Sequence, residues 1–211
     1  MCWHSGCYVS HGNGLEIMRL RILLVTDQND RAVLLEQALG AVRHQIVAAI
    51  RPDDDLCFYA RQARPDAVVA SLDQPDSALV EQLEQLSREQ PLPVVVFADR
   101  SGSGPLRAAV KAGVSAYVVD GLEAARVGPV LETALARFAE FQALRRERDA
   151  AVARLSERKL VERAKGILMR RRGLPENAAY QTLRRMAMDR GKRMAEVAES
   201  VIVAEEMLAQ G

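Results

Sequence analysis

Residues 157–202 read ERKLVERAKGILMRRRGLPENAAYQTLRRMAMDRGKRMAEVAESVI and predict three short helices joined by tight turns. Gly173 and Gly191 interrupt the helical pattern, and Pro175 suits the first turn of the second helix. Each helix has an apolar face at helical spacing, made of Leu160, Ala164, Ile167 and Leu168 in the first, Ala178, Ala179, Leu183, Met186 and Ala187 in the second, and Met194, Val197, Ala198, Val201 and Ile202 in the third. Three such faces can bury one another, so the stretch predicts a small three-helix bundle.

The charge of the chain is distributed unevenly around this predicted bundle. Between residues 142 and 193, 16 Lys and Arg stand against 6 Asp and Glu, a net charge of +10. The rest of the chain holds 13 basic and 22 acidic residues, so the overall charge is only +1. A basic module attached to an acidic body is typical of a polyanion-binding effector joined to a controlling domain.

The first 17 residues, MCWHSGCYVSHGNGLEI, lack the apolar segment of a signal peptide. No later apolar run reaches the roughly 18–20 residues of a membrane span, and three scattered cysteines favour a reducing cytoplasm over a disulfide framework. The leader contains potential zinc ligands at Cys2, His4, Cys7 and His11, but their spacing matches no usual zinc finger. We therefore expect a cytoplasmic protein with no metal or cofactor, whose residues 1–17 are disordered or precede a true start at Met18.

Strands and helices alternate from residue 20 to residue 137. Continuous apolar runs such as LRILLV are typical of buried parallel strands. The predicted strands are Leu20–Val25, Gln45–Ile50, Ala67–Ser71, Val94–Ala98 and Ala116–Val119. The predicted helices are Asp30–Leu39, Asp53–Ala63, Ser77–Glu89, Pro105–Ala112 and Glu123–Arg137. The pattern predicts an α/β fold with a doubly wound, five-stranded parallel sheet, followed by a long helix and the three-helix bundle.

The order of these units resembles a response-regulator receiver domain over about residues 19–138. In such domains acidic residues hold Mg²⁺, an aspartate is the nucleophile, and a hydroxyl and a lysine hold the transferred phosphoryl group. These groups lie at the carboxyl ends of the strands. The matching positions here are Thr26 and Asp27 after the first strand, Ser71 after the third with Asp73 two residues beyond, Ala98 after the fourth and Asp120 after the fifth.

Nearly every one of these positions departs from the receiver pattern. Ser71 replaces the phosphoaccepting aspartate, Ala98 replaces the hydroxyl, and Asp120 inverts the charge of the lysine. We therefore expect a pseudo-receiver that is regulated by protein contact and is not phosphorylated. The alternative is that Asp73 or Asp27 still accepts phosphate, and the absence of a visible compensating cation in the sequence argues against it.

A long helical pattern without Pro or Gly covers residues 134–164. One stripe of this helix carries the apolar residues Phe138, Phe141, Leu144 and Leu155, and Arg148 interrupts it. We expect the stripe to pair two copies of the chain, the alternative being a solvated linker helix with i,i+4 ion pairs. The expected domains are a leader at 1–17, a pseudo-receiver at 18–133, a coiled-coil linker at 134–156 and an RNA-binding domain at 157–211.

The bundle carries a family resemblance in three blocks. Residues 162–169 read ERAKGILM, residues 178–188 read AAYQTLRRMAM, and Met194 is followed at the expected spacing by Val197 and Ala198. These blocks resemble the ANTAR domain, the RNA-binding output of transcription antitermination regulators. In the front half, AGVSAYVVDGL at 112–122 resembles the nitrate-responsive NasT branch of that group, to which AmiR, with its degenerate receiver, is related.

The resemblance implies a mechanism and partners. Antiterminators of this family are usually dimers that bind paired hexanucleotide-loop hairpins in a leader RNA and prevent a downstream terminator from forming. For the NasT branch it implies control of nitrate or nitrite assimilation, with a separate nitrate/nitrite-binding, NasS-like sensor protein as inhibitor. We therefore expect a homodimeric RNA-binding regulator and not an enzyme, without a membrane partner.

Charge and shape indicate which residues would contact RNA. Lys and Arg can pair with phosphates and release counterions, Gly166 would permit close approach of a helix or an RNA backbone, and Tyr180 would either stack on a base or belong to the core. The expected RNA-binding residues are Arg163, Lys165, Gly166, Arg170, Arg171, Arg172, Tyr180, Arg184 and Arg185. The alternative is a DNA-binding response regulator, although the third helix, with four acidic residues and no basic ones, would repel DNA.

Overall fold

The computed structural model describes residues 19–100, 103–119 and 122–209. It divides into two compact units, Met1–Glu140 and Phe141–Gly211. The leader expected to be disordered lies outside the described residues. The expected limits at residues 133 and 156 remain a prediction. In the described part of the chain, no helix has the length and apolar character needed to cross a membrane.

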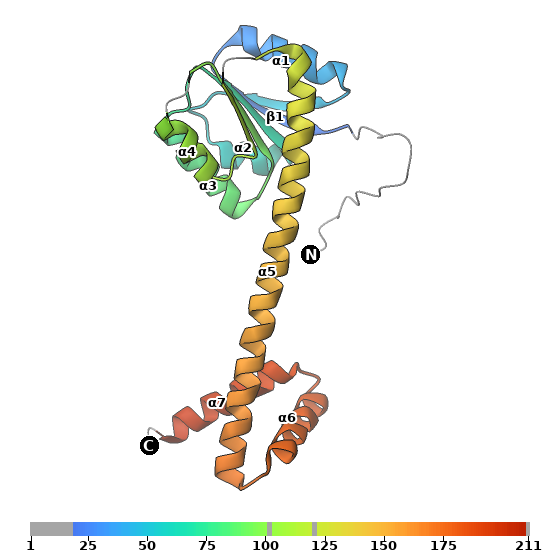
Figure 1. The fold of residues 1–211 in the computed structure, drawn as a ribbon, viewed down its shortest axis with the longest axis vertical. Helices are drawn as coiled ribbons and strands as arrows, with labels where there is room; N and C mark the ends of the chain where they lie inside the picture. Colours follow the sequence, from blue (N-terminus) through green and yellow to red (C-terminus); the bar gives the residue numbers. More distant parts are fainter. Residues whose placement is uncertain (1–18, 101–102, 120–121, 210–211) are drawn as a thin grey trace. The chain divides into compact units, whose positions relative to one another are not determined.

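The first unit is built on a five-stranded sheet in the order β2-β1-β3-β4-β5, and all neighbouring strands are parallel (Figure 1). The strands are β1 (Arg21–Thr26), β2 (Gln45–Ile50), β3 (Ala67–Leu72), β4 (Val94–Ala98) and β5 (Ala116–Val119). Every residue of β3 and β4 is buried, as expected for central strands covered on both faces. The predicted fold class is confirmed.

Helices cover both faces of this sheet and create two cores. The helices are α1 (Asn29–Ala41), α2 (Leu56–Ala63), α3 (Ser77–Glu89), α4 (Ser103–Lys111) and the start of α5 (Ala124–Arg172). One core joins α2 and α3 to the sheet through residues such as Leu56 and Leu83. The other joins α1 and α5 to the opposite face through residues such as Leu35 and Leu131. The two cores fix where the carboxyl ends of the strands emerge.

Aspartate side chains cap α2 and α3, and the cap moves the start of one of them from the sequence-based boundary. A start at Asp53 was expected for α2, but the helix begins at Leu56 because the Asp55 carboxylate accepts a 2.8 Å hydrogen bond from the Phe58 N–H. The α3 boundary was predicted correctly, and Asp76 caps it in the same way by accepting from the Leu79 N–H. Caps of this kind satisfy amide groups that the first helical turn leaves unpaired.

Gly113 directs the chain from α4 into β5. Its φ is +97°, a conformation that L side chains rarely adopt. A Cβ at this position would also lie 2.6 Å from Ser87 Oγ. Only glycine therefore permits this turn.

The second unit is a bundle formed by the end of α5, α6 (Glu176–Arg190) and α7 (Met194–Ala209). Residues 124–172 form one uninterrupted helix, as expected for a bundle helix that continues the linker. Gly191 ends α6 with φ +59°, and its N–H donates to the carbonyls of Ala187 and Met188. The bundle core contains Ala164, Ile167, Leu168, Ala179, Leu183, Ala187, Val197, Ala198 and Ile202. These are residues of the predicted apolar faces, so the three-helix prediction is confirmed.

Candidate functional site

The carboxyl ends of β1, β3 and β4 meet at one edge of the sheet, where the expected phosphoacceptor positions lie. Thr26 pairs in register with Ser71, and Leu72 pairs with Ala98. Because side chains alternate along a strand, Ser71 points to the same face as Val69, which α1 and α5 cover. The Ser71 hydroxyl is buried without a hydrogen-bond partner among the described residues. The position expected to hold the acceptor thus presents a buried hydroxyl.

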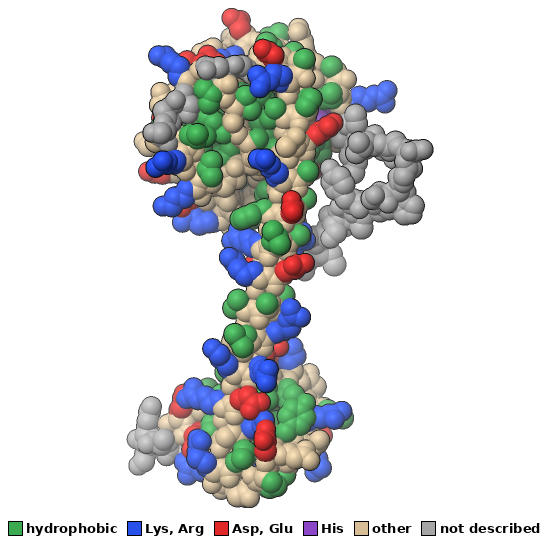
Figure 2. Space-filling view, in the orientation of Figure 1, with side chains coloured by type: hydrophobic (Ala, Val, Ile, Leu, Met, Phe, Trp, Pro, Cys, Tyr) green, Lys and Arg blue, Asp and Glu red, His purple; other side chains and the backbone are tan. Residues whose placement is uncertain are grey.

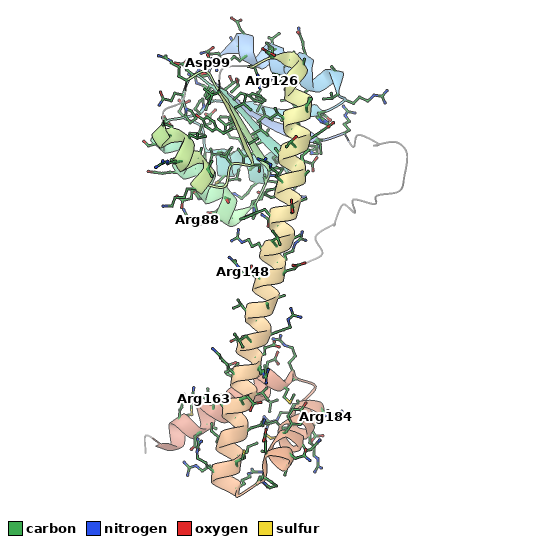
Figure 3. The ribbon with its side chains drawn as sticks, viewed as in Figure 1. Arg88, Asp99, Arg126, Arg148, Arg163 and Arg184 are labelled. Atoms are coloured by element: carbon green, nitrogen blue, oxygen red, sulfur yellow. The ribbon has the colours of Figure 1, made fainter. Side chains whose placement is uncertain are left out.

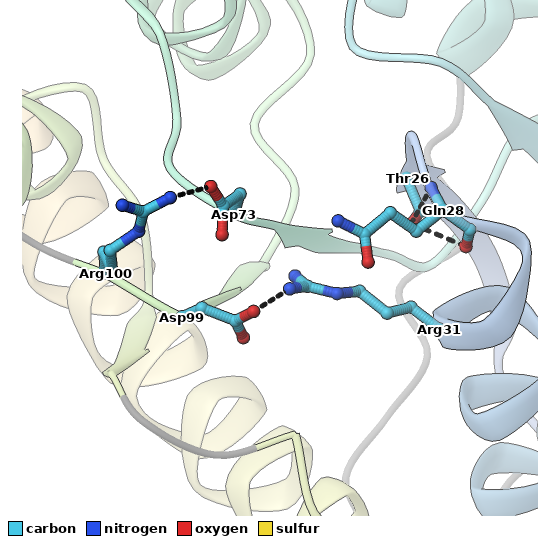
Figure 4. A network of polar contacts seen from close by, with 6 residues as sticks. All are labelled: Thr26, Gln28, Arg31, Asp73, Asp99 and Arg100. Atoms are coloured by element: carbon cyan, nitrogen blue, oxygen red, sulfur yellow. Dashed lines mark hydrogen bonds and ion pairs between the residues drawn. The ribbon is translucent and has the colours of Figure 1, made fainter.

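Two arginine–carboxylate pairs flank this edge (Figure 4). Arg31 of α1 donates to the Asp99 carboxylate just beyond β4, and the Arg31 side chain is only 11% exposed. Arg100 donates to Asp73 with 2.6 Å between Nη2 and Oδ2, and its side chain is 76% exposed. The expectation that no cation compensates the acidic residues at this edge is therefore wrong. The fold brings one guanidinium from α1 and another from the segment after β4.

The sequence alone indicates only part of these two ion pairs. Asp99 and Arg100 directly follow β4, and residues in that place must lie at the carboxyl edge of the sheet. Arg31 is 68 positions from Asp99, and nothing in local spacing pairs them. The pairing depends on how α1 packs against the sheet.

The other positions expected in the phosphorylation site are Thr26, Asp27, Ala98 and Asp120. The Thr26 hydroxyl accepts a 3.3 Å hydrogen bond from the Gln28 N–H. Asp27 is exposed and forms no ion pair with another described residue, and Ala98 is buried. Asp120 lies outside the described residues. In the described ranges no group of three or more His, Cys, Asp or Glu could hold a metal ion.

In the second unit, the side chain of Lys165 is buried. Its side chain is 8% exposed, and its ammonium lies 2.9 Å from Glu162 Oε2 and 2.7 Å from Glu176 Oε1. Hydrogen bonds to Glu176 and Glu162 raise the pKa of Lys165, and the same contact lowers the pKa of Glu176. Glu162 is on α5 and Glu176 begins α6, so the amine ties two helices together.

The arginines of this unit fall into two groups. Arg163 forms an ion pair with Glu206 at 2.7 Å, and Arg171 forms one with Glu205 at 2.9 Å, so both are engaged by the end of α7. Figure 2 shows carboxylates among the basic side chains on the visible face of the unit. The exposed arginines without a carboxylate partner among the described residues include Arg170, Arg172, Arg184 and Arg185.

Gly166 and Tyr180 are the two uncharged residues of the expected RNA interface. A Cβ on Gly166 would meet Arg170 Nη1 at 3.5 Å, an ordinary contact, so close helix packing does not require glycine there. Tyr180 is 37% exposed and is not a member of the buried core. Its ring is therefore partly available on the surface of α6.

The expected dimerisation stripe is exposed along most of its length. Phe141, Leu144 and Leu155 are between 55% and 63% exposed, whereas Phe138 is half-buried. Figure 2 shows apolar and basic side chains interleaved along this part of α5. Sequence reasoning missed Val152, which is 60% exposed. At 100° per residue it lies on the same face as Phe141.

Comparisons with known proteins match the two units to different domains. Residues 149–202 match the family described as "ANTAR domain". The receiver domain of a modulated diguanylate cyclase from Desulfovibrio desulfuricans G20 aligns with 57% of this chain and 97% of its own, with TM-score 0.50 and 18% identity. A CheY-like receiver domain protein from Methanospirillum hungatei JF-1 aligns with 58% of this chain and 98% of its own, with TM-score 0.51 and 16% identity. These likenesses support the receiver fold alone.

Two transcriptional regulators are similar to this chain in sequence. The "Nitrate regulatory protein" of Klebsiella oxytoca is 45% identical over 53 residues, which are 25% of this chain and 13% of that protein. The "Transcriptional regulatory protein PdtaR" of Mycobacterium tuberculosis is 31% identical over 182 residues, covering 86% of this chain and 89% of the relative. A receiver-like sheet and a bundle matching the ANTAR domain thus occur in one chain that aligns with nearly all of a known regulator, and this chain belongs to the family of ANTAR-domain response regulators.

Proposed function

We propose that this chain is a transcription antitermination regulator that binds hairpin leader RNA through its C-terminal ANTAR unit. The observation that carries the proposal is a set of exposed arginines, such as Arg170 and Arg184, that have no carboxylate partner in the described part of the chain and lie on a bundle that matches that domain. Such arginines can neutralise phosphates and release counterions without first breaking an internal ion pair. Binding would hold the leader hairpins in a form that prevents the downstream terminator.

A mobility-shift titration tests this proposal. The probes are a leader RNA with two hexanucleotide-loop hairpins and a duplex DNA of matched length and charge. We expect the RNA to bind more tightly than the DNA at physiological salt. Equal binding of the two probes would favour the alternative, a DNA-binding response regulator, and would contradict antitermination.

The receiver unit acts in this proposal as a pseudo-receiver controlled by protein contact. Ser71 lacks the carboxylate that accepts the phosphoryl group in a receiver, Ala98 lacks the hydroxyl that holds it, and Asp73 and Asp99 already face arginines. Incubation with acetyl phosphate and Mg²⁺, followed by intact mass measurement, should give no adduct. A stoichiometric adduct on Asp27 or Asp73 would show that the receiver is still phosphorylated.

For the signal, we propose nitrate or nitrite, sensed by a separate NasS-like protein that inhibits this chain. The support is the 45% identity to 53 residues of the nitrate regulatory protein, together with the NasT-like features of residues 112–122. Calorimetric titration of this chain with such a sensor tests the idea. The complex should form without nitrate and dissociate when nitrate is added, whereas an association insensitive to nitrate and nitrite would remove the signal from the proposal.

A homodimer completes the proposal, with the exposed stripe of α5 as its interface. Phe141, Leu144, Val152 and Leu155 are apolar, more than half exposed and on one helix face. Two linked ANTAR units would bind two hairpins with a gain in effective concentration. Leu144→Glu should lower both the mass measured by light scattering and the affinity for the two-hairpin RNA. Arg146→Glu is the matched control, because Arg146 is also exposed and lies about 140° around the helix from Phe141, outside the stripe.

A further inference from the structure

The end of α7 places negative charge against a positively charged part of α5. The α7 helix contains four glutamates and no lysine or arginine. Glu205 Oε2 lies 2.9 Å from Arg171 Nε, and Glu206 Oε1 lies 2.7 Å from Arg163 Nη2. Two adjacent carboxylates of α7 thus compensate two arginines of α5.

Packing in the bundle core restricts where these carboxylates can lie. Arg163 and Arg171 are eight residues apart, which is about 12 Å along a helix. Ile167 lies midway between them and belongs to the same core as Ile202 of α7. Ile202 precedes Glu206 by about one helical turn, so burial of the isoleucine holds the end of α7 near both arginines. Figure 3 labels Arg163 on the lower part of α5, which Glu206 reaches from α7.

Both arginines remain open to solvent although they are paired. The Arg171 side chain is 55% exposed and that of Arg163 is 61% exposed, whereas Glu205 is only 24% exposed. Glu205 also accepts from Arg171 Nε with both carboxylate oxygens, at 3.0 and 2.9 Å. A phosphate could therefore approach either guanidinium from the solvent side, where it would compete with the carboxylate for the same N–H donors.

The residues beside Arg171 show what its pairing changes. Arg170, Arg171 and Arg172 end α5 as three consecutive arginines. Of these three, Arg171 alone forms an ion pair within the described part of the chain. An ion pair between exposed side chains contributes little to stability, so the bundle gains little from holding Arg171. The consequence of the pair is instead that one of three adjacent arginines is already bound.

We propose that Glu205 and Glu206 are autoinhibitory. By occupying Arg171 and Arg163, they keep the affinity of the ANTAR unit for RNA phosphates below what its basic residues would allow. A phosphate that binds Arg171 must first separate it from Glu205, which offsets part of the gain from releasing counterions. This proposal rests on the proposed binding of RNA, and its experiment separates the two.

Removing one carboxylate at a time from the full-length chain tests the autoinhibition. Glu205→Gln keeps the shape of the side chain and removes its charge, so Arg171 becomes free to contact a phosphate. For the two-hairpin leader RNA, the slope of the logarithm of the binding constant against the logarithm of salt should steepen by about 0.7. If the contact is lost near about 1 M salt, the affinity at about 0.15 M salt should rise about fourfold. Glu206→Gln should act in the same way through Arg163.

Two controls separate this effect from a general change in charge. Glu199→Gln removes the same charge from α7, and Glu199 is exposed and forms no ion pair with a described residue. It should leave the slope unchanged and raise the affinity much less, because salt screens a charge that makes no contact. The double variant Arg171→Ala, Glu205→Gln should bind like Arg171→Ala alone, since no guanidinium remains to be freed.

Each contrary result has a separate meaning. The autoinhibition is wrong if Glu205→Gln and Glu206→Gln raise the affinity no more than Glu199→Gln, or if the gain persists in the double variant. If Glu205→Gln lowers the melting temperature, Glu206→Gln decides alone, because both partners of that pair are exposed and its loss costs little stability. If neither the unaltered chain nor Glu205→Gln binds the hairpin RNA better than duplex DNA, the proposed function itself fails, and the autoinhibition of RNA binding fails with it.

Discussion

The receiver edge and the ANTAR unit both contain arginine–carboxylate pairs, yet the pairs leave different groups available. At the receiver edge, Asp73 and Asp99 each face an arginine, and the Ser71 hydroxyl is buried at the end of β3, where the sequence predicted the acceptor position. In the ANTAR unit, carboxylates engage some basic residues, whereas exposed arginines such as Arg184 form no ion pair with any residue that the structure describes. Net charge alone therefore does not show which charged side chains are available to bind a ligand. That depends on whether each side chain already has a partner of opposite charge.

The largest expected effect tests whether the two units are energetically separate. Leu183 is fully buried in the bundle core, so Leu183→Ala should destabilise that unit by about 2–5 kcal/mol. Hydrogen exchange should show lost protection in α6 and α7 but unchanged protection in β3 and β4. Met188→Ala, on a side chain 71% exposed, is the control and should cost little. Equal loss of protection in both units would show that they unfold together.

A second comparison lies within the receiver edge. Arg31 is 11% exposed and Arg100 is 76% exposed. Arg31→Ala removes a buried side chain and its packing as well as the partner of Asp99, which is itself 49% exposed, so it should cost about 1–3 kcal/mol in chemical denaturation. Arg100→Ala breaks an exposed pair and should cost less than about 1 kcal/mol. Similar costs would mean that burial does not distinguish the two pairs.

Salt dependence measures which arginines of the ANTAR unit contact phosphate. For single-stranded nucleic acid, the logarithm of the binding constant changes with the logarithm of salt by about −0.7 per contacted phosphate. If Arg170 contacts one phosphate, Arg170→Ala should reduce the slope by about that amount. Arg171 is held by Glu205, so Arg171→Ala should reduce it less. A larger change for Arg171→Ala would indicate that RNA displaces the α7 carboxylate.

The smallest expected effect concerns pH and the Lys165 contact. The pKa of Glu176 is lower in the folded chain, so its contribution to stability is present above the unfolded pKa of about 4.3 and is lost as pH falls through the folded pKa. The pKa of Lys165 is raised, so its contribution is present below about pH 10.4 and is lost as pH rises through the folded pKa. Thermal unfolding of Glu176→Gln against pH should show a weaker acid-side decline than the unaltered chain. If the thermal stability of the variant and of the unaltered chain declines identically at acid pH, other carboxylates cause the decline.

The elements of the fold could be predicted because their signals are local. A run such as VVVFA at Val94–Ala98 is apolar on both faces, as is typical of a strand covered on both sides, and its bounds were predicted correctly. The bundle followed from helical periodicity and from Gly173 and Gly191, both of which have positive φ. Errors occurred at ends such as that of α2, where one cap by Asp55 moved the first residue.

The candidate sites were predictable by residue type and only partly by role. The sequence alone placed Ser71 and Ala98 at the ends of two predicted strands, and it determined that residues 142–193 carry a net charge of +10. It could not show that Lys165 is buried between two glutamates or that Tyr180 is partly exposed. Burial of one side chain depends on the helix that packs over it.

Tertiary structure alone decided which charges are available. Arg31 and Asp99 are 68 positions apart, and Arg163 and Glu206 are 43 positions apart. Periodicity acts over a few residues, because it reflects the turn of a helix or the pleat of a strand. An ion pair instead requires two side chains to approach within a few ångströms, and for residues this far apart only the packing of helices against a sheet or against one another brings them there.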